Sequence, residues 1–526
     1  MSVEIEVQPL DSPRLVTDHL AGSGSVRRFL PASPTDLAAF RERADDAARR
    51  FGREERRAVA ELLQPLADEG ARKLQRFVHE GGVMVTTGQQ PGLFGGPAYT
   101  LNKPLAASKL AQTLENRLGI TVLPVFWIAS DDHDWTEANH LYLTTANGEL
   151  RRLGLPDDEL PVPLSERTLP AGIGPLREEL CRELAAHGRR RIKGVAGYRP
   201  GASAAAAFTE LMRSLLEGTG LFLVNGADPL LKGMGRRVLQ ASLQDSQDHQ
   251  ERLSERTREL EGQGYQPQVS VLEGGANLFL RTESGRERLF RFRGGWLARA
   301  SGERFTDRQL LDVLLADPGR FSPNVLLRPV VEAEVLPTIA YLGGPAEVSY
   351  LAQAAVLFER CGVPQPVVVP RPSLTLVEAG VRREVESLGL SLERLSEPPH
   401  ELAMGVARRL LPEPVASALA ELRVSVGHAF ELLIERGRGE IDPTLAGPLG
   451  AARNRALLEV ARAEKKALGA VKRVHAAELQ TLDRVLAQLR PLGEPQERVV
   501  SILPYLARHG PGLLSRILER TDFPLA

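Results

Sequence analysis

Short apolar runs separated by helical patterns occupy the first two-thirds of the chain. Residues 83–86 and 122–129 are β-branched or aromatic, and each run ends in a polar cluster. Between them, residues 105–118 carry good helix formers and one apolar face. This order predicts a strand, a glycine-rich loop, a helix and a second, parallel strand. Such a unit places its ligand at the carboxyl ends of its strands, where both polar clusters fall.

Further patterns extend this α/β prediction. Apolar runs at 220–228, 336–342 and 367–369 predict additional strands of the core, and helical spacing is found at 208–216, 234–262 and 346–360. Residues 37–79 predict one or two amphipathic helices. Alternating runs within 265–305 predict antiparallel strands with one wet face. Residues 141–200 are rich in proline and glycine, which predicts an insertion without long regular elements.

Beyond residue 378 the pattern of apolar and polar residues is helical. Apolar residues step by threes and fours over 415–433 and again over 468–489, with a glycine-containing loop expected at 437–450. We therefore expect two long helices in an antiparallel hairpin, whose apolar seam pairs with a second copy of the chain. The predicted division is core 1–150, insertion 151–200, core 201–235, insertion 236–320, core 321–375, helical domain 376–490 and a C-terminal segment 491–526.

Composition narrows the functional class. The 526 residues include 66 basic and 67 acidic side chains, so no global field attracts nucleic acid or an anionic membrane. No basic-then-apolar leader or membrane-length apolar run is evident, which predicts a cytoplasmic protein. Two cysteines 180 positions apart, Cys181 and Cys361, favour neither a disulfide scaffold nor a thiolate zinc site.

The glycine-rich loop is the first chemical candidate. Gly88, Gly92, Gly95 and Gly96 allow sharp turns and close approach of backbone amides to an anion, while Lys103 could hold a phosphate or carboxylate. The spacing matches neither a Walker loop nor a dinucleotide fingerprint, and a structural turn is the commoner explanation of such a loop. Both interpretations stay open at this point.

The cluster Asp131-Asp132-His133-Asp134 is a sharper signal because it directly follows an apolar strand. His133 could take a proton from an amine while a neighbouring aspartate orients the imidazole or binds a substrate ammonium. The alternative is a turn in which an aspartate caps the next helix. A metal site at Asp132, His133 and His140 lacks supporting spacing.

A looser set of polar residues lies at the margins of the last core elements. Arg328, placed before a proline at a presumed strand margin, and Arg371 supply cationic groups. Glu347, Tyr350 and Gln353 add hydrogen-bonding groups. Each alone is typical of a surface ion pair, but together they suit a phosphate or carboxylate ligand.

These residues lie within motifs that resemble one known family. The motifs are TGQQPGLFGGPAYTLNK, GLFLVNGADPLLK, PVFWIASDDHDWTEANH, NLFLR, RPVVEAEVLPTIAYLGGPAEVSYLAQ, VVPRPSLT and QERV near Glu497. The resemblance is to the bacillithiol-biosynthesis cysteine-adding enzymes, a family of cysteine ligases, and it runs through nearly the whole chain. The sequence departs from the family pattern at Glu332, Ala333 and Leu351, which bears on the shape of the substrate pocket and on the acceptor.

The resemblance implies a Rossmann-like core interrupted by two connecting-peptide insertions and followed by a coiled-coil domain that forms a homodimer. It also implies a reaction that joins the carboxyl group of L-cysteine to the amine of glucosaminyl malate, the last step toward bacillithiol. The predicted catalytic residues are His133, Asp132 and Asp134. The residues predicted to bind substrate or nucleotide are Gln89, Gln90, Gly92, Tyr99, Lys103, Asp131, Arg328, Glu347, Tyr350, Gln353 and Arg371.

Amide formation from a free carboxylate requires activation of that carboxylate, and ATP is the usual means, through an acyl-adenylate or an acyl-phosphate. Gly92, Lys103 and Arg328 are the expected phosphate partners, and His133 or Asp132 the expected base. Mg²⁺ could accompany ATP, and no tightly bound metal is predicted. Two rival functions remain: a ligase or nucleotidyltransferase with another amine acceptor, and a non-catalytic dimeric scaffold that binds a nucleotide.

Overall fold

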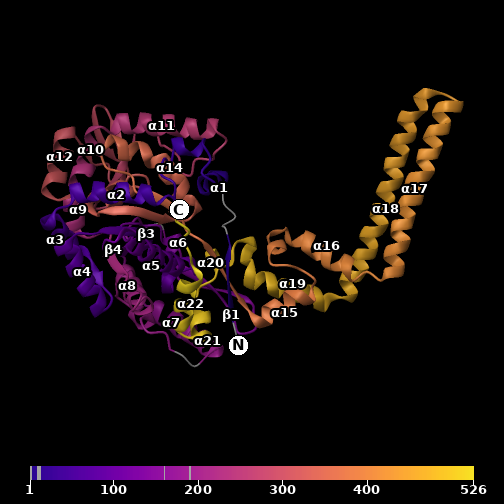
Figure 1. Ribbon diagram of the computed structural model, residues 1–526, viewed down its shortest axis with the longest axis horizontal. Coiled ribbons are helices and arrows are strands. Elements are labelled where there is room, and N and C mark those ends of the chain that lie inside the picture. The colour runs from indigo at the N-terminus through magenta and orange to yellow at the C-terminus, as the bar shows by residue number, and fades with distance from the viewer. Residues whose placement is uncertain (1–2, 9–12, 159, 189–190, 526) are drawn as a thin grey trace. The chain divides into compact units, whose positions relative to one another are not determined.

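A computed structural model describes residues 3–8, 13–158, 160–188 and 191–525. The chain forms two compact units (Figure 1). The larger contains Ile5–Leu376 together with Gln496–Ala526, and the smaller contains Met1–Glu4 and Val377–Pro495. The chain therefore returns to the larger unit after completing the smaller one.

A six-stranded sheet forms the centre of the larger unit. Its strands are, in spatial order, β14 (Val367–Pro370), β13 (Thr338–Gly343), β3 (Val83–Gln89), β4 (Val122–Ile128), β7 (Phe222–Asn225) and β2 (Gln64–Pro65). The first five are parallel, and β2 is antiparallel to β7. The strands predicted from the apolar runs are confirmed.

The direction in which the chain adds strands reverses beside β3. From β3 the chain adds β4 and then β7 on one side, whereas β13 and β14 lie on the other. The strand order therefore has a switch point between β3 and β13. In open parallel sheets, the crevice at the carboxyl ends of the strands flanking a switch point is the usual ligand site.

Helices cover both faces of this sheet because alternate strand residues are apolar on both sides. On one face Val83 and Val85 pack with α2 (Leu37–Arg50) and α5 (Tyr99–Leu118). On the other, Met84 belongs to a core shared with α13 (Arg328–Val335) and α14 (Pro345–Arg360). The α/β prediction is thus confirmed in its layers as well as its strands.

Three details of the predicted helices differ. Residues 37–80 form three helices, α2, α3 (Arg53–Leu62) and α4 (Asp68–Glu80), rather than one or two, and Pro65 lies in the second break. Helix α5 begins at Tyr99 rather than near residue 105 and contains Pro104. The first insertion includes the 15-residue helix α7 (Ile173–His187), contrary to expectation, because its only proline, Pro175, lies in the first turn, where proline is tolerated.

The second insertion contains the predicted antiparallel sheet. Its strands lie in the order β11 (Arg304–Phe305), β10 (Gly295–Ala298), β9 (Gly285–Phe292), β8 (Gly275–Thr282) and β12 (Phe321–Pro323). Helices α10 (Arg236–Gln244), α11 (Ser246–Gly262) and α12 (Asp307–Ala316) accompany it. Strand β12 pairs with β8 although its residues begin the predicted last part of the core.

The smaller unit is helical, and its longest helices form the hairpin seen in Figure 1, α17 (Glu413–Glu440) and α18 (Ala446–Val474). The hairpin prediction is correct in kind but wrong in its second helix. Residues 468–489 are broken at His475, and α19 (Ala476–Leu489) instead shares a core with α15 (Ala379–Ser387) and α16 (Pro399–Arg409). Nowhere in the described residues is a helix long and apolar enough to cross a membrane.

Candidate functional site

The residues predicted to bind ligands gather mostly at the carboxyl ends of the parallel strands. Gln89 closes β3, Asp131 follows β4, Glu347 follows β13 and Arg371 follows β14. Lys103 comes from α5, the helix that connects β3 to β4. The sheet topology therefore brings together residues that lie up to hundreds of positions apart in sequence.

The loop after β3 requires glycine. Gly95 and Gly96 have φ of +89° and +65°, a region that other residues rarely adopt, and Phe94 is also left-handed at +49°. A Cβ on Gly92 would lie 3.2 Å from the Cα of Gly96. The loop is closed from outside by Tyr198, whose hydroxyl donates to the Gly92 carbonyl at 3.2 Å. This tight turn fixes where α5 begins.

Lys103 joins the two strands at the switch point. Its Nζ lies 3.0 Å from the Gly88 carbonyl oxygen, 2.9 Å from Gln89 Oε1 and 2.7 Å from Glu347 Oε2. An ammonium has three N–H donors, so these contacts use all of them. The side chain is only 5% exposed. Lys103 is therefore placed to hold the end of β3 against the first turn of α14, the helix that follows β13, with no donor left over for a phosphate in this arrangement.

Glu347 is held as a carboxylate. It accepts hydrogen bonds from the Tyr341 hydroxyl and the Gly344 amide, both at 2.8 Å, in addition to its contact with Lys103. Burial acts to raise the pKa of Glu347, but Lys103 and these donors outweigh it, and the pKa lies below its ordinary value. The Lys103–Glu347 pair is thus an internal ion pair across the switch point.

Arg328 begins α13, so its predicted position at a strand margin is wrong. Its guanidinium donates to Glu332 at 2.6 Å and to the hydroxyls of Tyr341 and Tyr350 at 3.0 and 2.9 Å. Burial raises the pKa of Tyr350 to about 12, so this phenol stays neutral. Glu332 is therefore the buried ion-pair partner of Arg328.

Arg371 is anchored by a residue that the site prediction missed. Glu497, on the short helix α20 (Gln496–Val499), is 1% exposed and accepts a hydrogen bond from Arg371 Nη1 at 2.6 Å. The same carboxylate also accepts from three further donors: Asn102 Nδ2 at 2.7 Å, Ser373 Oγ at 2.9 Å and the Leu374 amide at 3.1 Å. The QERV motif was the only sequence signal for Glu497.

One N–H donor of Arg371 is unpaired. Its Nε has no hydrogen-bond partner among the described residues, although the side chain is buried. A Cβ on Gly344, the residue before α14, would lie 3.6 Å from this Nε. The unpaired N–H of this guanidinium therefore lies beside the amino end of the 16-residue helix α14, where the Gly344 amide is bonded to Glu347.

The acidic cluster after β4 divides into separate roles. Asp131 forms an ion pair with Lys232, a buried residue absent from the predicted site, which also donates to the Phe321 carbonyl at 3.0 Å. Asp134 caps α6 (Trp135–Ala138) by accepting from the Glu137 amide at 3.0 Å, as the capping alternative predicts. Asp132 Oδ1 accepts from the amide of His133 at 2.7 Å. Its Oδ2 has no hydrogen-bond partner in the described part of the chain.

His133 is held by Arg286, a second residue missing from the site prediction. Arg286 comes from β9 of the second insertion, and its Nη1 lies 2.9 Å from His133 Nδ1. Because a guanidinium can only donate, Nδ1 accepts, and the proton of the neutral ring lies on Nε2. Burial, followed by the charge of Arg286, lowers the pKa of His133. The geometry favours a neutral imidazole that donates from Nε2.

Three glutamines complete the set of predicted binding residues, and only two of them lie at the strand ends. Gln89 donates to the Tyr99 hydroxyl at 3.2 Å, and burial raises the pKa of Tyr99 to about 12. Gln90 Nε2 lacks a partner among the described residues. Gln353 does not join the site: its amide bonds to Thr257 and to the backbone of Val269 instead.

The sequence of this chain is similar to those of proteins in one known family. Residues 1–372 match the sequence model of the N-terminal Rossmann-like domain of bacillithiol biosynthesis BshC, and residues 374–524 match that of its C-terminal coiled-coil domain. The chain belongs to the BshC family. Proteins named "Putative cysteine ligase BshC" from Solibacter usitatus and Koribacter versatilis are 32% and 31% identical to it, over 97% and 96% of this chain and 96% and 95% of theirs. The Bacillus anthracis relative of the same name is 25% identical over 98% of both chains.

Membership of the BshC family confirms the resemblance found in the sequence motifs. It also confirms the Rossmann-like core and the coiled-coil domain, and with them the enzyme class, a ligase of bacillithiol biosynthesis that forms a carbon–nitrogen bond. The roles of individual site residues stay predictions. Within the residues that the structure covers, no group of three His, Cys, Asp or Glu side chains is arranged to hold a metal ion.

Proposed function

We propose that the protein joins the carboxyl group of L-cysteine to the amine of glucosaminyl malate, in the cytosol, as the last step of bacillithiol synthesis. The cysteine carboxylate first attacks ATP, giving an acyl-adenylate and pyrophosphate or an acyl-phosphate and ADP. The amine then attacks the acyl carbon, and AMP or phosphate leaves. The amide forms as the ammonium loses its protons, which requires a base near the attacking nitrogen.

The observation that carries this proposal is the presence of two opposite environments along one edge of the sheet, at the ends of β14 and β4. The free Nε of Arg371 beside the start of α14 forms a cationic side suited to a carboxylate or phosphate. The turn at Asp132 and His133 forms a side that combines a carboxylate and an imidazole. Both follow strands of one parallel sheet, so an activated carboxylate and an amine can be bound at the same edge.

We assign the proton-accepting role to Asp132 in preference to His133. Asp132 Oδ2 faces no donor in the described chain, whereas His133 Nδ1 is already occupied by Arg286. His133 Nε2–H then donates a hydrogen bond to an oxygen of the substrate. Because all donors of Lys103 are used internally, we assign it to positioning Gln89 and Glu347, and Arg371 to the anion.

ATP is the proposed co-substrate, with Mg²⁺ as its companion in solution. The proposed phosphate partners are Arg371 and Gln90, which lie at the ends of β14 and β3. Arg371 Nη1 is already paired with Glu497, so the donor that Arg371 offers a phosphate is its unpaired Nε. Their contribution is to bind and orient the phosphates while the buried surroundings limit water.

We further propose that the hairpin α17–α18 forms a homodimer. Val415, Leu422 and Leu433 are 41%, 44% and 51% exposed and share one face of α17, and Leu458 of α18 is 60% exposed. Exposed apolar residues at helical spacing favour burial against another helix, and a second copy offers the matching surface. Sedimentation should show a dimer that dissociates when Leu433 and Leu458 are both replaced by glutamate.

The decisive assay incubates the purified protein with L-cysteine, glucosaminyl malate and ATP, with and without Mg²⁺, and follows products by mass spectrometry. We expect the ligated thiol to form, with AMP marking the adenylate route and ADP the acyl-phosphate route. Turnover with a different amine and none with glucosaminyl malate would instead favour a ligase of another pathway. No turnover with any amine, from a folded dimer, would favour the non-catalytic scaffold.

Two isosteric variants test the assignment of the base. Asp132→Asn keeps the Oδ1 that accepts from the backbone, so it should fold normally while losing turnover by about 10²-fold or more, the usual scale of general-base catalysis. Asp134→Asn is the matched control, because asparagine caps a helix as well as aspartate does. Equal activity of both variants would refute the role of Asp132.

A further inference from the structure

Lys232 is a buried cation to which the proposed reaction gives no role. It lies on α9 (Pro229–Met234), the short helix after β7, and only 1% of it is exposed. Because β7 runs parallel to β4, the carboxyl ends of the two strands lie side by side, and α9 begins near the turn that follows β4. A lysine is almost never buried to this degree without partners, so its contacts show what it holds.

Two acceptors of Lys232 belong to different parts of the fold. Its Nζ forms an ion pair with Asp131, in the turn after β4, and donates a hydrogen bond to the Phe321 carbonyl at 3.0 Å. Phe321 is the first residue of β12, which pairs with β8 of the second insertion. Lys232 therefore connects the turn after β4 to the inserted sheet.

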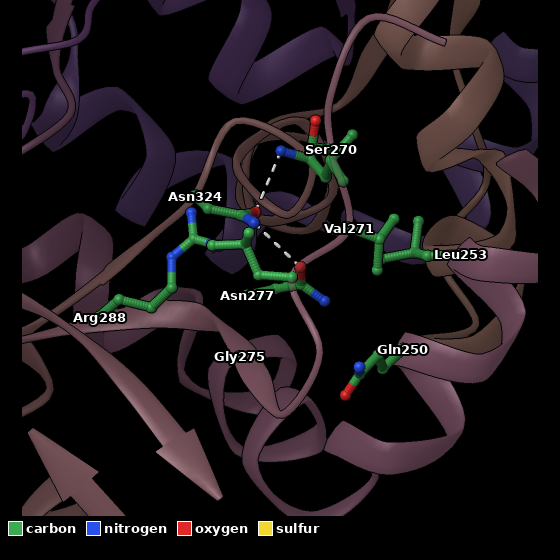
Figure 2. Close-up of a pocket in the computed structure, with 10 residues that line it drawn as sticks. Gln250, Leu253, Ser270, Val271, Gly275, Asn277, Arg288 and Asn324 are labelled. Atoms are coloured by element: carbon green, nitrogen blue, oxygen red, sulfur yellow. Dashed lines mark hydrogen bonds between the residues drawn. The ribbon is translucent and has the colours of Figure 1, made fainter.

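Strand β12 is itself fixed to the insertion. All three of its residues pair with β8. Immediately after it, Asn324 Nδ2 donates to Asn277 Oδ1 of β8 at 2.9 Å (Figure 2), and the Asn324 amide donates to the Asn277 carbonyl at 2.8 Å. Both asparagines are buried. Because β12 is held by this double contact, the Phe321 carbonyl is a fixed acceptor for Lys232.

A second series of contacts leads from β12 back to the same turn. Arg286 Nε donates to Ser322 Oγ at 2.8 Å, and its Nη2 donates to the Pro323 carbonyl at 3.1 Å. Its Nη1 donates to His133 Nδ1 at 2.9 Å. Lys232, the turn after β4, Arg286 and β12 therefore form a closed ring of contacts, in which each member holds the next.

Asp131 acts on both buried cations of this ring. Burial lowers the pKa of Lys232 and that of Arg286, and in both residues the charge of Asp131 is the largest influence in the opposite direction. Asp131 is hydrogen-bonded to Lys232, whereas no hydrogen bond joins it to Arg286 in the described part of the chain. Lys232 therefore keeps this carboxylate from Arg286, whose N–H groups stay on β12 and on His133.

We propose that Lys232 is a positioning residue for the ligation. By keeping Asp131 from Arg286, it keeps Arg286 on His133 Nδ1 and so keeps the imidazole proton on Nε2, the nitrogen assigned above to the substrate. The inference rests on the proposed function, because it concerns the roles given to His133 and its neighbour Asp132. Lys232 itself is buried and acts through Asp131 and Arg286, not on the substrate.

The first readout is the tautomer of His133 in the full-length protein. It is measured by NMR from the ring ¹⁵N shifts of labelled histidine, with the signals assigned by their loss in His133→Gln. In the wild type, above the pKa of His133, we expect a protonated Nε2 and an unprotonated Nδ1. In Lys232→Met, Asp131 is free to pair with Arg286, so Nδ1 loses its donor and we expect both tautomers to be populated.

The pKa of His133 gives a check in the same experiment. Burial and then the charge of Arg286 lower this pKa, and the other charges that act on it are those of Asp132, Asp134 and Arg167. Lys232→Met leaves these other groups in place. Because Arg286 moves toward Asp131 in this variant, the pKa of His133 should rise.

Asp131→Asn is the matched variant, because it breaks the same ion pair from the other side. Both variants should lower the urea midpoint of unfolding, since each leaves a charge without its partner. Only Lys232→Met should change the tautomer of His133, because Asp131→Asn leaves no carboxylate to draw Arg286 away. A merely structural role of the pair predicts that the two variants affect His133 alike. Should Lys232→Met not fold, Ser322→Ala removes the acceptor of Arg286 Nε and should change the tautomer in the same direction.

Turnover gives the second readout. Lys232→Met should lower kcat by about 10²-fold, the usual cost of a misplacement of about 1 Å, with KM for ATP little changed because Arg371 lies at the end of another strand. A wild type that has the Nε2 tautomer and loses it in Lys232→Met, but turns over no amine, supports the positioning and refutes the proposed reaction. A wild type that turns over, with Lys232→Met keeping both the tautomer and kcat, overturns the inference.

Discussion

Replacing Glu497 with glutamine removes the charge opposite Arg371 while keeping the size of the side chain. In the native structure the two side chains are 1% and 2% exposed, and the carboxylate accepts four hydrogen bonds, two on each oxygen. A glutamine retains one of these oxygens and turns an NH₂ group toward two donors. The substitution therefore leaves a buried guanidinium without a counter-charge and unpairs two further groups.

The expected cost is large. Removing one partner of a buried ion pair typically lowers the free energy of unfolding by about 3–5 kcal/mol. Arg371→Met should have a similar cost, because it leaves the carboxylate of Glu497 buried and uncompensated. In the double variant both charges are absent, so its loss should be smaller than the sum of the single losses by about 2–3 kcal/mol.

Urea unfolding followed by tryptophan fluorescence measures these losses. The three tryptophans, Trp127, Trp135 and Trp296, are buried and all belong to the larger unit, so the signal reports on the unit that contains the pair. Glu255→Gln serves as the control, because this carboxylate belongs to a half-exposed pair with Arg252 and should change stability by less than about 1 kcal/mol. If the losses of the two single variants simply add, the ion pair does not hold the end of β14, and the argument fails.

Three further predictions rest on buried charges. Lys103→Met leaves Glu347 without its main charge partner, so burial should raise the pKa of Glu347 above its unfolded value. The variant should then gain stability in urea as pH falls toward 4.5, whereas the wild type, in which the pKa of Glu347 is lowered, loses this contribution only as pH falls below 4.5. His249 is 1% exposed with a lowered pKa, so the stability associated with its neutral ring is complete above pH 6.5 and lost as pH falls below it. His249→Leu should therefore flatten the unfolding free energy between about pH 6.5 and 5, and an unchanged slope would refute this. Arg286→Gln should raise the pKa of His133 measured by NMR, because the charge of Arg286 is the largest cause after burial; a constant pKa would contradict the contact.

The core strands could be read from the sequence because strands buried on both faces are rich in apolar residues. Strand β4 (VLPVFWI) is apolar along its length, and β3 (VMVTTGQ) begins with an apolar run and ends in polar residues and glycine. The long helical hairpin was harder to place, because its helices are mostly exposed and share one heptad-like pattern with α19. Nothing in the local pattern at His475 distinguishes a continuous helix from a break followed by a helix in another core.

The start of helix α5 was predicted wrongly for a related reason. The helix predicted over residues 105–118 in fact begins at Tyr99 and contains Pro104. Pro104 is the sixth helical residue, where its missing N–H removes one hydrogen bond from the ladder. Burial of this segment offsets the loss, since Pro104 and its neighbours lie within the core of the larger unit. A tertiary contact of this kind leaves no trace in local propensity.

The candidate site shows the same limit in its chemistry. Asp131, His133 and Arg371 were identifiable because each follows a core strand within a few residues, and Lys103 because it lies just after the glycine-rich loop. Their partners are distant: Glu497 is 126 positions from Arg371, and Arg286 is 153 positions from His133. These partners decide the roles, because a lysine with three internal acceptors positions strands and a histidine that accepts from an arginine donates from its other nitrogen. The sequence can thus locate a side chain with reactive chemistry. Which of its atoms carries the proton, and which donor stays unused, is determined by the partner that the fold places beside it.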